Sequence, residues 1–128
     1  MRKEKFDINQ KAIIIPVFVE IDDQTNRYDF IVDTGTPETL ISEMALRAMG
    51  YTRVDSIEDV PIQTVGGRAT AYRYVIDSIT ALGVTRRNMK IISHQMPSGS
   101  GAYGLLGLDF FEDKELTINF KKAEITVK

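Results

Sequence analysis

Cysteine is absent from the 128 residues of this chain, and histidine occurs once, as His94. The lack of cysteine excludes a disulfide framework, a thiol nucleophile and a thiolate metal site. A single histidine with no second histidine or carboxylate at ligand spacing does not make a metal site, so we expect no metal or other cofactor. The net charge of −2 provides no basic field, and nucleic acid is therefore not expected as a partner.

Long apolar runs are also lacking. The longest, Ala12 to Val19, is interrupted by Pro16 and falls far short of the roughly 20 residues of a membrane-spanning helix. Residues 1–5 lead into polar residues and not into the apolar core of a signal peptide. We therefore expect a soluble, cytoplasmic chain without membrane contact, while an upstream anchor or signal would lie outside this sequence. The length predicts a single domain, residues 1–128.

Segments rich in β-branched residues alternate with turn residues along most of the chain, which predicts an all-β fold. Residues 12–21 are expected to form a strand in which Pro16 occupies an edge or a bulge. Residues 22–26 have the composition of a turn, and the chain is expected to return as a strand at residues 28–32. These two strands predict a hairpin.

Helix signals are few and local. Ser42 is the expected N-cap of a short helix that ends before Gly50, and Asp109 with Glu112 makes a plausible capping box for a second one. Residues 95–101 have the composition of a loop. Two final strands are expected at residues 116–120 and 125–127.

A long hairpin is predicted in the middle of the chain. Residues 61–65 and 68–76 have strand patterns, and Gly66 and Gly67 lie between them near the tip. Two glycines at an exposed tip form a tight turn that can also flex. The simple interpretation is a hairpin turn, and the functional one is a flap that closes over an extended ligand.

One short segment combines a buried strand with polar chemistry. Apolar residues 30–32 lead up to an aspartate, after which a glycine and Pro37 end the strand. The aspartate is flanked by two threonine hydroxyls, and the glycine lets another backbone or a substrate approach closely. The candidate catalytic residues are Asp33, Thr34, Gly35 and Thr36.

The Asp-Thr-Gly sequence at residues 33–35 resembles the active-site loop of aspartic proteases, in particular the single-domain, retroviral-type retropepsin-like family. The diglycine hairpin follows at the distance typical of that family, and Leu105-Leu106-Gly107 fits its second apolar-apolar-glycine segment. The resemblance covers about residues 12–127 and is closer to bacterial and retrotransposon-like members. It implies a closed barrel or sandwich of hairpins with one or two short helices, acting as a homodimer.

The resemblance also implies roles for individual residues. Peptide hydrolysis by this chemistry needs two carboxylates at close range, and one Asp-Thr-Gly per chain implies that Asp33 from two subunits forms the pair. Thr34 would reach across the dimer axis, and Thr36 would donate a hydrogen bond to Asp33. The residues implied to bind an extended peptide or protein substrate are Ile31, Val65, Gly66, Gly67, Tyr103 and Leu105.

Two positions depart from the retroviral pattern. Retroviral enzymes have acidic residues after the catalytic loop that hold the substrate backbone, and here Pro37 and Glu38 occupy these positions. They also have a bracing arginine after the glycine of the second segment, where this chain has Leu108. Substrate contacts outside the central pockets, and part of the bracing of the dimer, are therefore expected to differ.

Three functions follow from these patterns. The first is an aspartic endopeptidase acting as a homodimer. The second is a binding or scaffold module that keeps the fold, binds extended peptides and does not cleave them. The third treats Asp33 as a phosphate-accepting residue, which would require Mg²⁺, further downstream carboxylates and helices that alternate with strands.

Overall fold

The computed structural model describes residues 2–96 and 99–128, so residues 97 and 98 of the predicted loop lie outside the described part. The short helical segments are α1 (Glu43–Ala48), η1 (Arg53–Asp55) and η2 (Leu108–Phe111). The strands are β1 (Arg2–Lys5), β2 (Ile14–Ile21), β3 (Gln24–Val32), β4 (Leu40–Ser42), β5 (Glu58–Thr64), β6 (Gly67–Ala81), β7 (Val84–His94), β8 (Gly104–Leu106), β9 (Leu116–Asn119) and β10 (Glu124–Val127).

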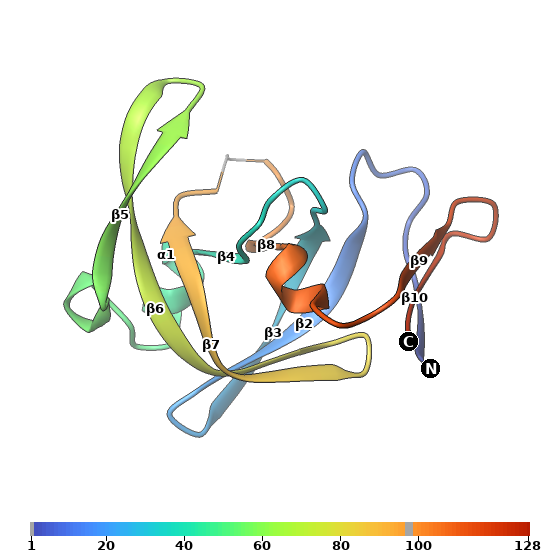
Figure 1. The fold of residues 1–128 in the computed structure, drawn as a ribbon, viewed down its shortest axis with the longest axis horizontal. Helices are drawn as coiled ribbons and strands as arrows, with labels where there is room; N and C mark the ends of the chain where they lie inside the picture. Colours follow the sequence, from blue (N-terminus) through green and yellow to red (C-terminus); the bar gives the residue numbers. More distant parts are fainter. Residues whose placement is uncertain (1, 97–98) are drawn as a thin grey trace.

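Six strands close into a barrel. The larger sheet has the order β2-β3-β8-β4-β7-β6-β5, and β2 also pairs with β6, which joins its two sides and leaves β5 outside the closure (Figure 1). Closure removes the exposed strand edges that an open sheet of this size would present. The prediction of an all-β, retropepsin-like barrel with few short helices is confirmed.

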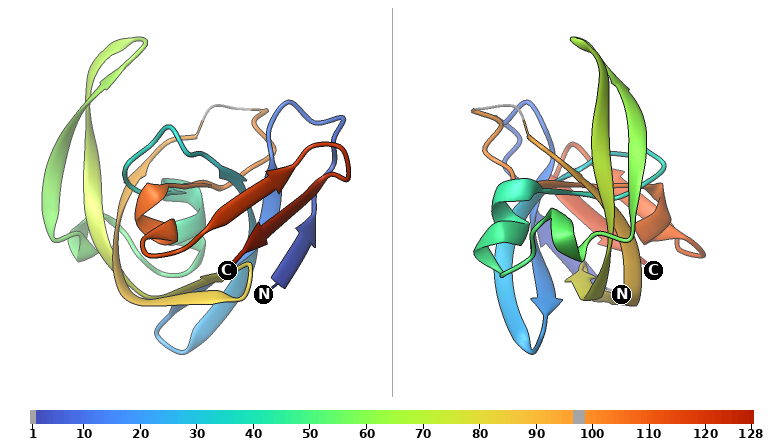
Figure 2. Two further views of the ribbon diagram at one scale, coloured as in Figure 1. Left: turned by 45° about the vertical axis from the view of Figure 1, so that its right-hand side comes forward. Right: turned by 90° about the vertical axis from the view of Figure 1, so that its left-hand side faces the viewer.

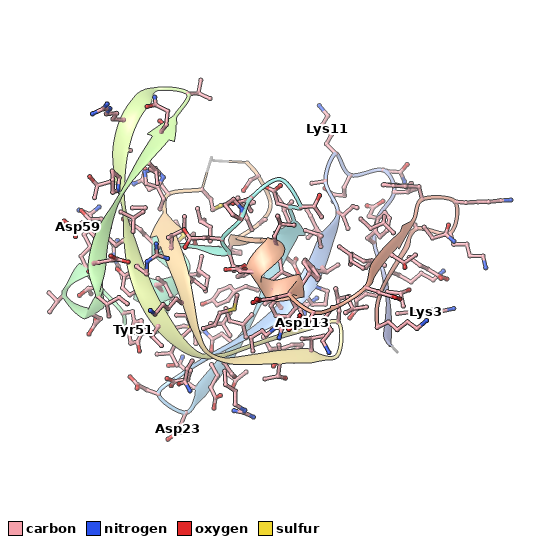
Figure 3. The ribbon with its side chains drawn as sticks, viewed as in Figure 1. Lys3, Lys11, Asp23, Tyr51, Asp59 and Asp113 are labelled. Atoms are coloured by element: carbon pink, nitrogen blue, oxygen red, sulfur yellow. The ribbon has the colours of Figure 1, made fainter. Side chains whose placement is uncertain are left out.

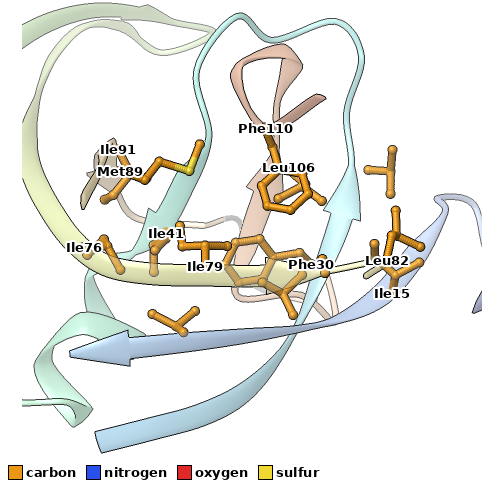
Figure 4. Packing of buried hydrophobic residues seen from close by; sticks show 14 of the residues in the cluster. Ile15, Phe30, Ile41, Ile76, Ile79, Leu82, Met89, Ile91, Leu106 and Phe110 are labelled. Atoms are coloured by element: carbon orange, nitrogen blue, oxygen red, sulfur yellow. The ribbon is translucent and has the colours of Figure 1, made fainter. Parts of the chain in front are cut away.

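Strand alternation fills the barrel interior. In β2 every second residue is buried, and the same alternation holds at the end of β3, where Phe30 and Val32 point inward. Figure 4 shows Phe30, Leu106 and Phe110 among the aliphatic side chains of this core. Burying each large apolar side chain contributes about 1.5–3 kcal/mol, so the barrel supplies a rigid base for the loops at its ends.

The β2–β3 hairpin is tighter than the sequence suggested. Its turn consists of Asp22 and Asp23 alone, both with positive φ, and Asp23 marks its tip in Figure 3. Two aspartates in this conformation make a two-residue turn, so residues 24–27 join the ladder and the predicted start of the strand at residue 28 was wrong. Pro16 lies outside the part of β2 that pairs with β6, as its missing N–H favours.

The predicted caps of α1 are confirmed. The Ser42 hydroxyl accepts a hydrogen bond from the Ala45 N–H at 3.1 Å, and Gly50 follows the helix with a φ of 95°. Among the described residues, no helix is long and apolar enough to cross a membrane.

The chain ends form a separate three-stranded sheet in the order β1-β10-β9, with both termini side by side (Figure 2). The two C-terminal strands confirm the prediction, although β9 ends at Asn119. The strand β1 had no signal in the sequence because residues 2–5 contain no apolar residue. Its register against β10 pairs Lys5 with Glu124 and Lys3 with Thr126, and both lysines form ion pairs with Glu124.

Candidate active site

Asp33 is held at the point where β3 leaves the barrel. Its backbone N–H donates to the carbonyl of Leu106 at 2.9 Å, and its Oδ1 accepts from the Gly35 N–H at 2.9 Å. The side chain is only partly buried. The buried strand thus fixes the backbone of Asp33, and the glycine N–H orients its carboxylate at the barrel mouth.

The strand β8 threads between β3 and β4, directly beside this loop. It runs parallel to β3, with Val32 opposite Leu106, and antiparallel to β4. A Cβ atom at Gly104 would lie 2.5 Å from the Leu40 carbonyl oxygen, and one at Gly107 would lie 2.8 Å from the backbone of Glu38. Only glycine allows backbones to approach this closely, so the apolar-apolar-glycine segment passes directly beside the loop of residues 33–39.

Asp109 anchors the far end of the loop of residues 33–39, the candidate catalytic loop. Its carboxylate accepts hydrogen bonds from the backbone N–H of Thr39 at 3.0 Å and from the Thr39 hydroxyl at 2.7 Å. The same hydroxyl accepts from the Gly107 N–H at 3.1 Å. The predicted capping box of Asp109 with Glu112 was therefore wrong, because the aspartate side chain turns to Thr39 and η2 has no side-chain cap.

Backbone contacts complete this anchor. The N–H of Leu108 donates to the carbonyl of Thr36 at 2.9 Å, and the N–H of Asp109 donates to that of Pro37 at 3.2 Å. Leu108 occupies the position of the retroviral bracing arginine, and the loop is braced here by the neighbouring aspartate from within the same chain.

A model of the aspartyl protease family matches residues 17–110, which include the catalytic loop, the hairpin and the anchor. The chain belongs to this family. Its fold is similar to a retropepsin-like aspartic protease from Rickettsia conorii, with a TM-score of 0.72 and 18% identity over 96% of this chain and 86% of the other. It is also similar to EIAV protease complexed with the inhibitor HBY-793, with a TM-score of 0.59 and 17% identity over 82% and 89% of the two chains. No curated protein matches closely enough to count as a relative.

The two threonines of the loop, Thr34 and Thr36, differ in their surroundings. Thr34 is exposed at the tip of the loop. Thr36 was expected to donate to Asp33, and this expectation was wrong, because its hydroxyl donates to the carbonyl of Glu38 at 3.2 Å. A hydroxyl has one proton to donate, so this contact tightens the loop and leaves the Asp33 carboxylate to the Gly35 N–H.

The predicted pocket residues lie beside the catalytic loop. Ile31 on β3 is paired with Leu105 on β8, and both are half-buried on the face of the sheet opposite the barrel core. Tyr103 lies just before β8, and its ring packs on Tyr28 with centroids 5.3 Å apart. The structure therefore brings Ile31 and Leu105 together, while the Tyr103 ring is held against Tyr28.

The predicted flap is a hairpin that extends beyond the barrel. Its strands β5 and β6 are joined by Val65 and Gly66, and Gly67 adopts a φ of 117°, which only glycine adopts readily. Val65 is fully exposed at the tip. In Figures 1 and 2 the hairpin rises from the same side of the molecule as the loop after β3.

Two site residues, Thr39 and Asp109, were missed by the reasoning from sequence. The sequence signal for Thr39 was its position directly before the apolar residues of β4. The structure shows that its side chain is completely buried. Buried hydroxyls need partners, and Asp109, two residues beyond the glycine that passes the loop, was available to provide one.

Proposed function

We propose that this aspartyl protease is an endopeptidase whose active species is a homodimer, with Asp33 of each subunit forming the catalytic pair. The observation that carries the proposal is the position of Asp33, half-exposed at the end of a barrel strand in a loop anchored from both sides. Family membership supports the reaction class. The downstream chain folds into strands and not into alternating helices, which disfavours a phosphate-accepting role.

The chemistry follows from placing two such carboxylates close together. Like charges at short range cannot both ionise, so one carboxyl keeps its proton. The ionised Asp33 takes a proton from water, and the protonated Asp33 of the other subunit polarises the scissile carbonyl. A two-fold axis at the loop generates the pair from a single Asp-Thr-Gly, and the exposed Thr34 is available to contact the other loop.

The substrate in this proposal is an extended peptide. Ile31 and Leu105 form the apolar wall beside Asp33, and Tyr103, which directly precedes β8, adds to it. The tip of the hairpin, Val65 to Gly67, closes over the peptide backbone and adds hydrogen bonds in the manner of an additional strand. Specificity then depends on the apolar side chains next to the cleaved bond.

Substitution of Asp33 tests the proposal. Asp33→Asn removes both carboxylates of the dimer, and cleavage of a mixed peptide library should fall by about 10²–10⁴-fold or more. The asparagine keeps an oxygen for the Gly35 N–H, so the fold should remain. Asp23→Asn is the matched control, since Asp23 lies at the tip of a distant hairpin, and it should cleave as the parent does (Figure 3). Undiminished cleavage by Asp33→Asn would contradict the assignment.

A further inference from the structure

The guanidinium of Arg73 joins the loop after Asp33 to the β5–β6 hairpin, two segments that are distant in sequence. Arg73 lies on β6, and its side chain is only 16% exposed. One terminal nitrogen lies 2.5 Å from Oε1 of Glu38, and Nε donates to Oε1 of Glu58. We call the ion pair between Arg73 and Glu38 the Arg73 clamp.

The two contacts differ in what they connect. Glu58 faces Arg73 across the β5–β6 ladder, so their ion pair lies within the base of the hairpin. Glu38 belongs to the loop that follows the catalytic triplet, so its ion pair with Arg73 joins that loop to the hairpin. A two-pronged guanidinium suits this arrangement because its donors are fixed in one plane and point to separate acceptors.

Burial and charge favour the contact to the loop. The Glu38 side chain is 38% exposed and that of Glu58 is 56% exposed, so the pair with Glu38 is the better shielded from water. The pKa of Arg73 is raised above its ordinary value, chiefly by the hydrogen bond to Glu38, and burial opposes the shift. Glu38 lies at a position where retroviral enzymes have an acidic residue that holds the substrate backbone. In this chain its carboxylate is instead paired with Arg73 of the hairpin.

We propose that Arg73 is a positioning residue that fixes the base of the hairpin to the catalytic loop through Glu38, and thereby sets the width of the substrate cleft. The inference rests on the proposed peptidase function. Asp33 has its own hydrogen bonds to Leu106 and Gly35, so the clamp acts on the binding of the extended peptide and not on the catalytic carboxylates. Loss of the clamp therefore raises KM and leaves kcat largely unchanged.

Isosteric substitutions of the two glutamates that contact Arg73 distinguish this positioning role from stabilisation of the hairpin alone. Glu38→Gln weakens the link between loop and hairpin, whereas Glu58→Gln weakens only the pair inside the hairpin. Peptide cleavage should show KM raised about five- to tenfold in Glu38→Gln and in Arg73→Gln, with a much smaller change in Glu58→Gln. The double variant Glu38→Gln/Arg73→Gln should have the same KM as Arg73→Gln alone, because Arg73→Gln already removes the interaction with Glu38.

Other kinetic outcomes contradict the clamp. A fall in kcat at unchanged KM in Glu38→Gln indicates loss of folded enzyme. Equal effects of Glu38→Gln and Glu58→Gln indicate that the cluster only stabilises the hairpin. Additive effects in the double variant indicate that Glu38 and Arg73 act separately.

Hydrogen exchange tests the clamp without any requirement for activity. The N–H groups of Leu108 and Asp109 bond to carbonyls of the catalytic loop, so their exchange rates report how firmly the loop is held. In an Asp33→Asn background, adding Glu38→Gln or Arg73→Gln should make these N–H groups exchange faster than in Asp33→Asn alone. Adding Glu58→Gln should leave their exchange rates unchanged. If the parent chain cleaves no peptide, the proposed function fails and these rates still decide on the clamp. Equal rates in all variants would overturn the clamp alone.

Discussion

Thr39 shows how a single residue positions the candidate catalytic loop within one chain. The side chain is fully buried, and its hydroxyl both donates to Asp109 and accepts from the Gly107 N–H. A hydroxyl can donate once and accept twice, so one small side chain connects the loop after Asp33 to the segment that passes beside it. The loop is therefore positioned before any second subunit is present.

Thr39→Val tests this anchor, because valine has the shape of threonine without the hydroxyl. The Gly107 N–H loses its buried partner, and Oδ1 of Asp109 keeps only the Thr39 backbone N–H, which should lower the free energy of unfolding by about 2–3 kcal/mol. Urea unfolding measures the change. Thr39→Ser, which keeps the hydroxyl, is the matched control and should lose less. If the serine variant were the less stable of the two, packing of the methyl group would outweigh the hydrogen bonds.

The element that links the hairpin to the barrel is β6, which spans 15 residues from Gly67 to Ala81. Its first half pairs with β5 in the hairpin, and its second half pairs with β2 and β7 in the barrel. Near the middle, the ring of Tyr74 stacks on Tyr51 with centroids 5.9 Å apart. This stack and the Arg73 clamp both lie at the root of the hairpin, and neither involves the residues of its tip.

Ionisation of the Tyr74 hydroxyl should make the free energy of unfolding depend on pH in the alkaline range. Burial raises the pKa of Tyr74, and burial is also the main cause of the raised pKa of Tyr51. Above the usual tyrosine pKa of about 10, the unfolded chain loses a proton that the folded chain retains. Below that pH both tyrosines are protonated in both states, so the free energy of unfolding keeps its full value. It should fall as the pH rises through the folded-state pKa.

Tyr74→Phe should reduce this alkaline loss because phenylalanine cannot ionise. The measurement is urea unfolding of parent and variant at neutral pH and at several values above pH 10. The two proteins should differ little at neutral pH, and the parent should weaken more steeply with alkali. Parallel curves would show that the Tyr74 hydroxyl contributes nothing to the pH dependence.

Sequence patterns predicted the elements whose signals are local. The β-branched residues of β2, the Ser42 cap and the diglycine hairpin are all local signals, and each predicted element was found. Features set by distant contacts were missed: β1 depends on pairing with β10, and Asp109 turned to Thr39, 70 residues away, and not to its own helix. The Thr36 hydroxyl likewise found a backbone carbonyl that the motif alone does not reveal.

At the scale of the whole molecule, the barrel is complete and the proposed catalytic centre is not. One Asp-Thr-Gly occurs in the 128 residues, whereas the chemistry needs two carboxylates. Thr34 and Leu108 are exposed beside the loop, with Leu108 at 49%, and they offer contacts for a second copy. The terminal sheet ends in the edge strands β1 and β9, which can pair with further strands.

Without the retroviral arginine, the dimer is expected to be held by these contacts alone, so that it dissociates on dilution. Well below the dissociation constant, the amount of dimer scales with the square of the total chain concentration, and activity per chain falls. A transition-state analogue that contacts both subunits should restore the dimer by mass action.

The most direct test measures mass and cleavage on the same dilution series, using sedimentation or light scattering beside a peptide-cleavage assay. The shared-site account predicts that activity per chain falls in step with the fraction of dimer. It also predicts that the analogue restores the dimeric mass at concentrations where the free chain is monomeric. A monomer that cleaves with undiminished activity per chain would contradict the account.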